Sequence, residues 1–275
     1  MAAAALAALA LRPAGAADDF HVCALQSGDI AIAACSRAIA SGRYTGDNLS
    51  ALYTNRAFEY GNKGNRDLAI ADYTTAIKLN PKSALSYNNR ASIFREKGDL
   101  DRALKDYTSA IAIDPLPKSN VHINVYSSRG NIWLDKGDVD TALADFNEAI
   151  KRDPRYGVAY LNRSRAWSRK GQPDRALADL DKAIALDPKN ADIYNTRGLV
   201  WRAKHDLDRA IADFDQAIRL APRRSDAYYN RGATWEQKQE LRKALADFKT
   251  FTALAPSDPD GPKAVARVTT ALAGK

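Results

Sequence analysis

One 34-residue stretch decides the fold: residues 191–224 read ADIYNTRGLVWRAKHDLDRAIADFDQAIRLAPRR. Prolines recur with the same period at Pro154, Pro188, Pro222 and Pro256, and an earlier pair, Pro81 and Pro115, keeps the spacing. All four tryptophans of the chain follow it too, at Trp133, Trp167, Trp201 and Trp235. A fixed period of this length is typical of a stack of similar supersecondary units, each of which covers its neighbour's apolar face.

The period places six full repeats in the chain, at residues 50–83, 84–117, 123–156, 157–190, 191–224 and 225–258. It lengthens only between Pro115 and Pro154, by five residues, which indicates an insertion at 118–122. Within a repeat, positions 4, 8 and 11 form one helical stripe, and positions 20, 24 and 27 form another. Glycines mark a turn between the stripes, and a proline ends the second one. Each repeat is therefore predicted to be a helical hairpin.

This pattern resembles the tetratricopeptide repeat family. The family's small residue at position 8 is present as Ala57, Ala91, Gly130, Ser164, Gly198 and Gly232, and position 20 is alanine in all six repeats. The resemblance implies an all-α fold, a right-handed α-solenoid (superhelix) of antiparallel helix pairs. It also implies a non-enzymatic scaffold or adaptor that binds an extended peptide or a partner protein in its concave groove.

The segments outside the six repeats are expected to complete the stack. Residues 18–49 resemble a shortened hairpin with the turn at 26–29. Residues 259–275 are expected to hold a capping helix from Pro262 to about Ala273. Such a helix covers the apolar face that the last repeat leaves open.

Residues 1–17 read as a secretory signal peptide. An unbroken run of Ala and Leu from Ala2 to Leu11 is followed by Arg12, Pro13 and small residues. No basic residue precedes the run, so a disordered alanine-rich tail is the alternative. Export predicts a periplasmic or secreted protein, and a retained tail predicts a cytoplasmic one. After this segment no apolar run reaches the roughly 18 residues of a membrane-spanning helix.

The only two cysteines, Cys23 and Cys35, lie on either side of the turn at 26–29. Residues at similar distances from the turn of a helical hairpin face each other, and neighbouring alanines allow the two backbones to approach closely. If the protein is exported, we expect a structural disulfide between them. Two small buried thiols are the alternative.

Charged residues also recur in step with the repeat. Position 7, on the packed stripe of the first helix, is arginine in all six repeats, and position 23, on the stripe of the second, is aspartate in all six. A buried charge needs a partner. We therefore expect structural ion pairs, within a hairpin or between neighbours, between Arg56 and Asp72, Arg90 and Asp106, Arg129 and Asp145, Arg163 and Asp179, Arg197 and Asp213, and Arg231 and Asp247. The alternative is a ladder of free arginines that grips acidic ligands.

The opposite face of the first helix, at positions 2, 5, 6, 9, 12 and 13, lines the peptide-binding groove in the family that the pattern resembles. Here it carries amides and arginines: Asn55, Asn88, Asn89, Asn131, Asn162, Arg165, Arg169, Asn195, Arg202 and Asn230. Amides suit a peptide backbone, and arginines suit a carboxylate. A solvated polar surface is the plain alternative. The carboxylate-clamp arrangement of the family is not matched, so that specificity is not carried over.

Composition leaves two other classes of function open. The net charge of +8 and the pI of about 9.4 admit a basic module that binds an acidic polymer, such as nucleic acid, or an anionic surface. Pairing of six arginines and use of the aromatic residues in the core argue against nucleic acid. Self-association through the insertion or an end of the stack is the third interpretation.

No catalytic, metal or cofactor site is expected. The three histidines, His21, His122 and His205, have no metal-site spacing, and the two cysteines form no CxxC pair. The sequence has no glycine-rich phosphate loop and no recognisable nucleophile motif. We therefore expect no enzyme, no cofactor, and another protein or peptide as the partner.

Overall fold

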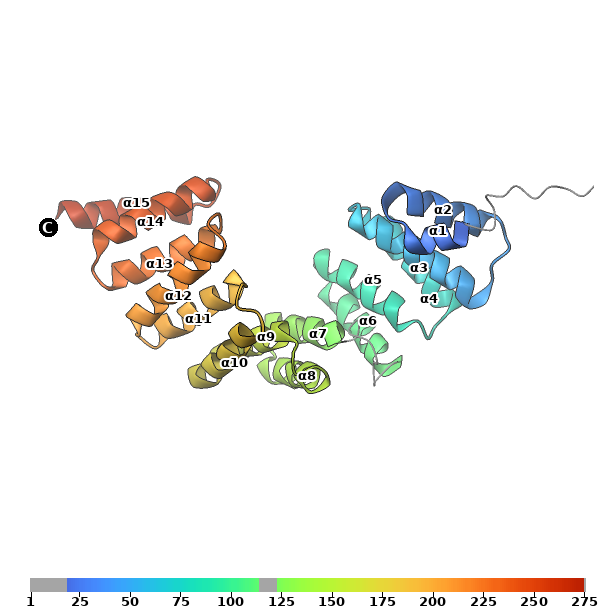
Figure 1. Cartoon of the computed structure of the whole chain (residues 1–275), viewed down its shortest axis with the longest axis horizontal. Coiled ribbons are helices and arrows are strands. Elements are labelled where there is room, and N and C mark those ends of the chain that lie inside the picture. Colours follow the sequence, from blue (N-terminus) through green and yellow to red (C-terminus); the bar gives the residue numbers. More distant parts are fainter. Residues whose placement is uncertain (1–18, 114–122, 275) are drawn as a thin grey trace, which may run out of the picture. The chain divides into compact units, whose positions relative to one another are not determined.

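The computed structural model describes residues 19–113 and 123–274 (Figure 1). The segment read as a signal peptide and the insertion at 118–122 lie outside these ranges. Within them the regular structure is entirely α-helical, with fifteen helices and no strand. The prediction of an all-α fold is confirmed.

The chain divides into two compact parts, one ending at Arg129 and the other beginning at Gly130. The first part contains α1 (Asp19–Leu25), α2 (Gly28–Ala40), α3 (Gly46–Asn62), α4 (Arg66–Leu79), α5 (Ala84–Glu96) and α6 (Leu100–Ile113). Helix α7 (Ile123–Asp135) crosses the division. The second part continues with α8 (Val139–Arg152), α9 (Gly157–Arg169), α10 (Pro173–Leu186), α11 (Ala191–Ala203), α12 (Leu207–Leu220), α13 (Ser225–Gln237), α14 (Leu241–Leu254) and α15 (Asp260–Ala273).

Consecutive helices pack in pairs, such as α3 with α4 in the first part and α11 with α12 in the second. Short turns make the partners antiparallel. The second helix of a pair also packs against the first helix of the next one, as α10 does against α11. This arrangement is an α-solenoid of helix pairs, as predicted.

The helix starts follow the repeat with one exception. Helices α5, α7, α9, α11 and α13 begin at residues 84, 123, 157, 191 and 225, the first residues of five predicted repeats. Helix α3 begins earlier, at Gly46, because Thr45 has the extended backbone of an N-cap residue. The first full repeat therefore has a longer first helix, which includes the end of the segment assigned to the shortened hairpin.

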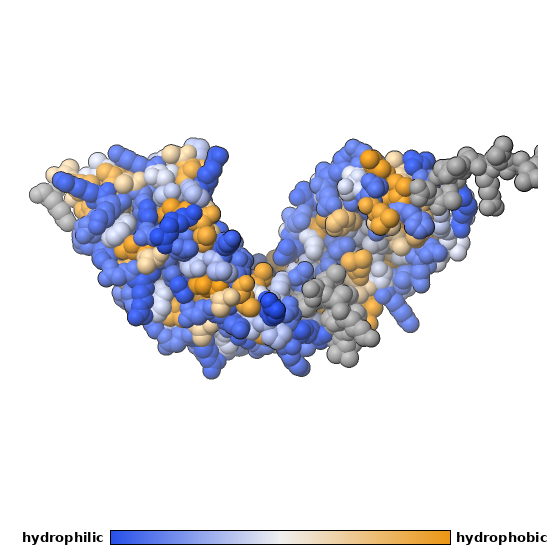
Figure 2. Space-filling view, in the orientation of Figure 1, coloured by the Kyte–Doolittle hydropathy of each residue, from blue (hydrophilic) through white to orange (hydrophobic). Residues whose placement is uncertain are grey.

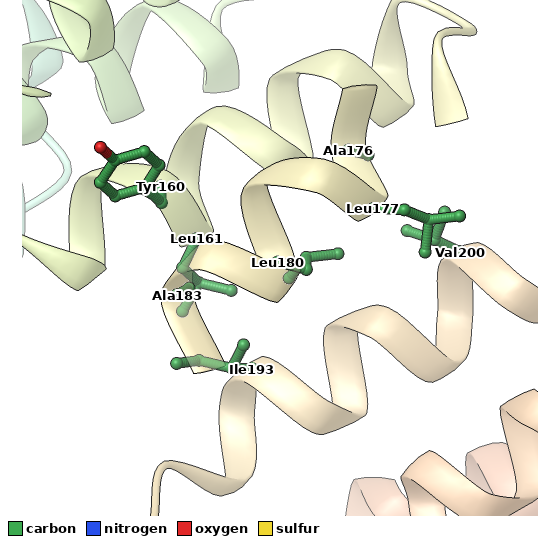
Figure 3. Close-up of a cluster of buried hydrophobic side chains, with 8 residues drawn as sticks. All are labelled: Tyr160, Leu161, Ala176, Leu177, Leu180, Ala183, Ile193 and Val200. Carbon is green, nitrogen blue, oxygen red and sulfur yellow. The ribbon is translucent and has the colours of Figure 1, made fainter. Parts of the chain in front are cut away.

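A buried cluster in the second part shows how successive hairpins share a core (Figure 3). It joins Tyr160 and Leu161 of α9, Ala176, Leu177, Leu180 and Ala183 of α10, and Ile193 and Val200 of α11. The alanines let the helices approach, and the larger side chains fill the remaining space. Because Ile193 and Val200 belong to the next repeat, that repeat covers the face that α9 and α10 leave open.

A contact between a glycine and an aromatic ring fixes the approach of the two helices in several repeats. A Cβ atom added at Gly198 would lie 2.7 Å from the nearest ring atom of Phe214, closer than such atoms pack. Where position 24 holds Leu180 in place of an aromatic ring, position 8 holds the buried Ser164. The small residue at position 8 is thus matched to the side chain at position 24.

The turn between the two helices of a repeat contains one residue in the left-handed conformation. Four repeats use glycine there, with φ from 72° to 86°: Gly64, Gly98, Gly137 and Gly171. The last two repeats use His205 and Gln239, with φ of 62° and 64°. A residue with a Cβ atom is strained in this region, whereas glycine is not.

Both ends of the described chain carry helices that cover the neighbouring repeat. Helix α15 packs the fully buried Ala264 and Val268 against Leu241, Ala244 and Phe248. It begins at Asp260, two residues before Pro262, where the sequence predicted its start. At the other end, α1 and α2 form a short hairpin that buries Cys23, Ala34, Cys35 and Ala38 with Leu52 of α3.

The face seen in Figure 2 is dominated by hydrophilic residues, with apolar residues in small scattered groups. Among the described residues, six large apolar side chains are exposed: Leu25, Ile30, Phe58, Leu68, Leu85 and Val158. In the described part of the chain, no helix combines the length and the apolar character that a membrane span requires.

Candidate functional site

The arginine at position 7 and the aspartate at position 23 form a two-point ion pair on facing helices of one hairpin. Arg56 Nε and Nη2 donate to Asp72 at 2.7 and 2.9 Å, and Arg90 donates to Asp106 at the same distances. In the second part the same atoms join Arg163 to Asp179 (2.8 and 2.6 Å), Arg197 to Asp213 (2.8 and 2.7 Å) and Arg231 to Asp247 (2.9 and 2.7 Å). The five carboxylates are buried. These pairs lie within a hairpin, one of the two arrangements that the sequence left open.

The third repeat is divided between the two compact parts. Arg129 is the last residue of the first part, and Asp145 belongs to the second. Their pairing stays a prediction.

The remaining guanidinium nitrogen, Nη1, reaches back to position 25 of the preceding hairpin. Its acceptors are Ser36 for Arg56 (3.0 Å), Thr74 for Arg90 (2.9 Å), Thr108 for Arg129 (3.2 Å), Asn147 for Arg163 (2.7 Å), Asp181 for Arg197 (2.7 Å) and Asp215 for Arg231 (2.6 Å). Each of these arginines therefore joins two neighbouring hairpins. The acceptor is a hydroxyl in the first three cases and an amide or a carboxylate in the others.

The ion pairs also affect protonation. Hydrogen bonds to Asp72, Asp213 and Asp247 raise the pKa of Arg56, Arg197 and Arg231, respectively, against the opposing effect of burial. Because each of the three nitrogens of these guanidinium ions already donates to an acceptor, little remains to hold a ligand. In these repeats the position-7 arginine is a scaffold residue.

A second set of ion pairs lies on the surface at the turns. A lysine that follows the first helix pairs with an aspartate at the start of the second helix of the preceding hairpin: Lys63 with Asp29, Lys97 with Asp67, Lys170 with Asp140, Lys204 with Asp174, and Lys238 with Asp208. Such exposed pairs contribute little to stability. They balance the charge of these five lysines locally.

The opposite sides of α9, α11 and α13 form the candidate site. Helix α11 contacts both α9 and α13, so the three first helices line one continuous surface, which we call the first-helix surface. Of the predicted amides, Asn162 and Asn195 are buried and Asn230 is half-buried. Asn230 Nδ2 donates to Asn195 Oδ1 at 3.1 Å, and Asn195 Nδ2 donates to Asp226 Oδ2 at 3.2 Å. These amides hold neighbouring repeats together beneath the surface.

The predicted arginines of this region have fewer partners. Arg202 Nη1 donates to the carbonyl of Asn230 at 3.4 Å. Arg165 Nη1 donates to Asn162 Oδ1, also at 3.4 Å. Arg169, further along α9, donates to the Leu134 carbonyl.

The remaining predicted residues lie elsewhere. Asn55, on α3, and Asn88 and Asn89, on α5, are half-buried in the first part, where Asn88 Nδ2 donates to Asn89 Oδ1 at 3.2 Å. Asn131 is half-buried on α7. In the first part, two apolar residues on first helices of the repeats, Phe58 and Leu85, are 50% and 43% exposed. The sequence offered a signal for both, since they occupy groove positions 9 and 2.

A cavity of about 590 Å³ opens on the first-helix surface. Its polar lining comes from Arg165, Ser168, Asn195, Thr196, Arg224 and Asp226, and its other lining residues are Gly171, Pro173, Leu199, Val200 and Ala203. The volume lies within the range of roughly 300–1,000 Å³ typical of ligand sites. Three repeats contribute to it, so it exists only where hairpins stack.

The two arginines of the cavity differ in their surroundings. Arg224 Nε and Nη2 donate to Asp226 at 2.7 and 3.0 Å, and its third nitrogen pairs with Asp192. Arg165 has no such carboxylate. Desolvation by the surrounding protein, followed by the positive charge of Arg224, lowers the pKa of Arg165, although part of its side chain reaches solvent. Desolvation also lowers the pKa of Arg202.

Sequence reasoning selected Arg165 and Asn195 but missed most of the cavity lining. Asp226 occupies groove position 2 and could have been chosen on that ground. Leu199 and Ala203 occupy groove positions 9 and 13 and could have been chosen in the same way. Val200, at position 10, was not distinguishable from a core residue, since it is buried.

The structure bonds the sulfur atoms of Cys23 and Cys35, whose Cα atoms are 4.8 Å apart. Both side chains are buried between α1 and α2. Within the described ranges, no group of three or more His, Cys, Asp or Glu side chains is arranged to hold a metal ion.

The stacked hairpins and the first-helix surface define a helical repeat protein of the solenoid class. Two family models, both described as tetratricopeptide repeat, match the chain, one at residues 198–269 and the other at 55–116 and 128–191. These segments cover most of the chain, so the protein belongs to the tetratricopeptide repeat family. No curated protein sequence matches it.

Solved structures share the fold. A tetratricopeptide repeat protein from Parabacteroides merdae ATCC 43184 is 21% identical, with a TM-score of 0.68 over 87% of this chain and 91% of that one. PilW, a type IV pilus biogenesis factor, is 20% identical, with a TM-score of 0.70 over 80% of this chain and 98% of its own. YrrB, described as a TPR protein with an unusual peptide-binding site, is 25% identical, with a TM-score of 0.51 over 70% and 96%. Each comparison extends over several successive repeats.

Proposed function

We propose that this protein is a non-enzymatic scaffold that holds an extended polypeptide on the first-helix surface of its second part. The tetratricopeptide repeat fold is in general a protein–protein interaction scaffold. The observation that carries the finer proposal is the cavity between α9, α11 and α13, which combines polar and apolar lining residues on this surface. YrrB, a similar repeat protein described as having a peptide-binding site, supports the same class of ligand.

Site-specific photocrosslinking tests this proposal. A photoreactive phenylalanine analogue is placed at Thr196, which lines the cavity, and in a control protein at Ala185, an exposed residue of α10 outside it. We expect a discrete crosslinked polypeptide from the native compartment at position 196 but not at position 185. Equal crosslinking at both positions would contradict the proposal.

Salt dependence and size separate the other two functions. Peptide binding on this surface is expected to survive moderate salt, because buried and apolar contacts contribute to it. Binding of an acidic polymer would collapse between low and physiological salt. A complex size that grows with the concentration of the protein alone would instead indicate self-association.

We also propose that the protein is exported and that the Cys23–Cys35 bond forms in an oxidising compartment. The Ala- and Leu-rich start of the sequence and the close approach of the two cysteines support this. Mass analysis of the mature protein tests it, with an expected N-terminus near residue 17 and a mass increase of two hydrogens on reduction. An intact Met1 with two free thiols would contradict it.

A further inference from the structure

The arginines of the second part discussed above fall into two groups according to the residues that they contact. The position-7 arginines each face a buried aspartate and a further acceptor, as Arg197 faces Asp213 and Asp181. Arg224 is likewise held by Asp226 and Asp192. Arg165, by contrast, pairs with no carboxylate of the described residues and makes a long hydrogen bond of 3.4 Å to the neutral amide of Asn162. It is therefore the cation of the cavity that an incoming group can reach and pair with.

The surroundings of Arg165 favour an anion. Arg165 is exposed where it lines the cavity. Desolvation of part of its side chain, followed by the positive charge of the nearby Arg224, lowers its pKa. An exposed guanidinium at the wall of a cavity is free to pair with a carboxylate that enters the cavity. The planar guanidinium also offers two parallel donors to such a group.

The rest of the cavity limits what the anion can be. Asp226 lines the cavity and Asp192 is paired to Arg224 beside it, and their negative charges disfavour a doubly charged group such as a phosphate. A single carboxylate is the better fit. Next to Arg165, the side chains of Pro173, Leu199 and Val200 offer an apolar wall, which suits an aliphatic side chain.

We propose that the Arg165 cavity recognises an acidic side chain of the bound peptide together with a neighbouring aliphatic side chain, which packs against Leu199 and Val200. The inference rests on the proposed function, since it names the peptide that the first-helix surface selects. Arg224 is not expected to pair with the peptide carboxylate, because its own charge is balanced by Asp192 and Asp226. An acidic side chain is favoured over a chain terminus because a polypeptide that runs along three helices presents mainly side chains.

A random 12-residue peptide library, displayed with its C-terminus fused to the phage coat, is panned on the full chain. In this format only side chains supply carboxylates. We expect enrichment of peptides in which Asp or Glu lies within two residues of Leu, Ile or Val. The best peptide is then synthesised with an amidated C-terminus, and its affinity is measured by fluorescence anisotropy.

Matched variants identify the residue responsible. Arg165→Gln is expected to weaken binding of the amidated peptide by at least about tenfold, the scale of one lost charge-assisted contact. Arg175→Gln removes the same charge from an exposed arginine of α10 that lies over Trp167, and it should leave the affinity unchanged. Replacing the acidic residue of the peptide by its amide should cost as much as Arg165→Gln does, and the two changes together little more.

The outcomes separate this inference from the proposed function. If peptides are enriched and bind but Arg165→Gln leaves their affinity unchanged, the inference fails and the proposed function stands. If binding needs a free C-terminal carboxylate, the ligand is a chain end and the inference is wrong. If the library enriches no peptide, both fail. The melting curve of Arg165→Gln is expected to match that of the unaltered protein, which shows that loss of binding is not loss of folding.

Discussion

Arg197 and Asp213 meet edge to edge, with Nε to Oδ2 at 2.8 Å and Nη2 to Oδ1 at 2.7 Å, while the third nitrogen of the same arginine reaches Asp181 of the preceding hairpin at 2.7 Å. Arg90 makes the same pair with Asp106, but its third nitrogen reaches the hydroxyl of Thr74. Arg197 thus contacts two carboxylates, whereas Arg90 contacts one carboxylate and one hydroxyl.

This difference predicts unequal costs for the same substitution. Asp106→Asn leaves Arg90 with neutral acceptors only, and we expect it to destabilise the first part by about 3–5 kcal/mol, as for a buried ion pair that loses one partner. Asp213→Asn leaves Arg197 beside Asp181, which is partly exposed, and should cost only about 1–3 kcal/mol. Urea unfolding of each variant measures both costs. Equal losses would contradict a role for the position-25 acceptor.

Because Gly198 lies against the ring of Phe214, we expect even the addition of one methyl group at this position to overpack the core. Gly198→Ala places a methyl group against Phe214 and should destabilise the second part by about 1–3 kcal/mol. Combining it with Phe214→Leu should recover part of the loss, because the fourth repeat packs Ser164 opposite Leu180. Thermal unfolding of the two single variants and the double variant gives the coupling. Strictly additive losses would argue against the contact.

The left-handed residue at Gln239 predicts a stabilising substitution. Gln239→Gly removes a backbone conformation that is strained for a residue with a Cβ atom, and we expect a gain of about 0.5–1 kcal/mol. The reverse change at the equivalent place, Gly171→Ala, should cost about 1–2 kcal/mol. Differential scanning calorimetry on both variants tests the pair. A Gln239→Gly protein that melts earlier would show that the glutamine is held by other contacts.

Tyr73 predicts an alkaline limit to the stability of the first part. Burial raises the pKa of its phenol above the ordinary value of about 10. Because the pKa is raised in the folded state, the neutral phenol of Tyr73 contributes to the free energy of unfolding. That contribution is complete below the ordinary pKa and is lost as the pH rises toward the folded-state pKa. The difference in stability between Tyr73→Phe and the unaltered protein should therefore shift in favour of the variant from pH 8 to pH 11. Urea midpoints at the two pH values check this, and an unchanged difference would contradict it.

Much of the fold could be predicted from the period alone. Position 20 must be small and position 24 large wherever two helices cross, so the pattern at Ala176 and Leu180 marks the core without a structure. The arginine and aspartate at positions 7 and 23 could be matched for the same reason, because both lie on packed stripes. Their third contact could not, since it depends on how far one hairpin is displaced from the next.

The candidate site was less accessible to sequence reasoning. The sequence presented Asn195 and Asn230 as open amides, but these residues bond to each other across two repeats. Arg224 was not selected, because its contacts are made across the repeat boundary, to Asp192 at the start of its own repeat and to Asp226 of the next one. A site assembled from three repeats depends on their relative rotation, which no single repeat encodes.

The contacts that each position-7 arginine makes with two neighbouring hairpins have a consequence for how the number of repeats can change. Every full repeat brings an arginine for the hairpin before it, and every full repeat except the last, which has Lys249 at position 25, brings a position-25 acceptor for the hairpin after it. Removal of residues 191–224 would therefore bring Arg231 against Asp181 in place of Asp215, and no charge would be orphaned. A gene for this protein can therefore duplicate or delete a repeat that lies before the last one while each new junction still places a position-25 acceptor against an arginine.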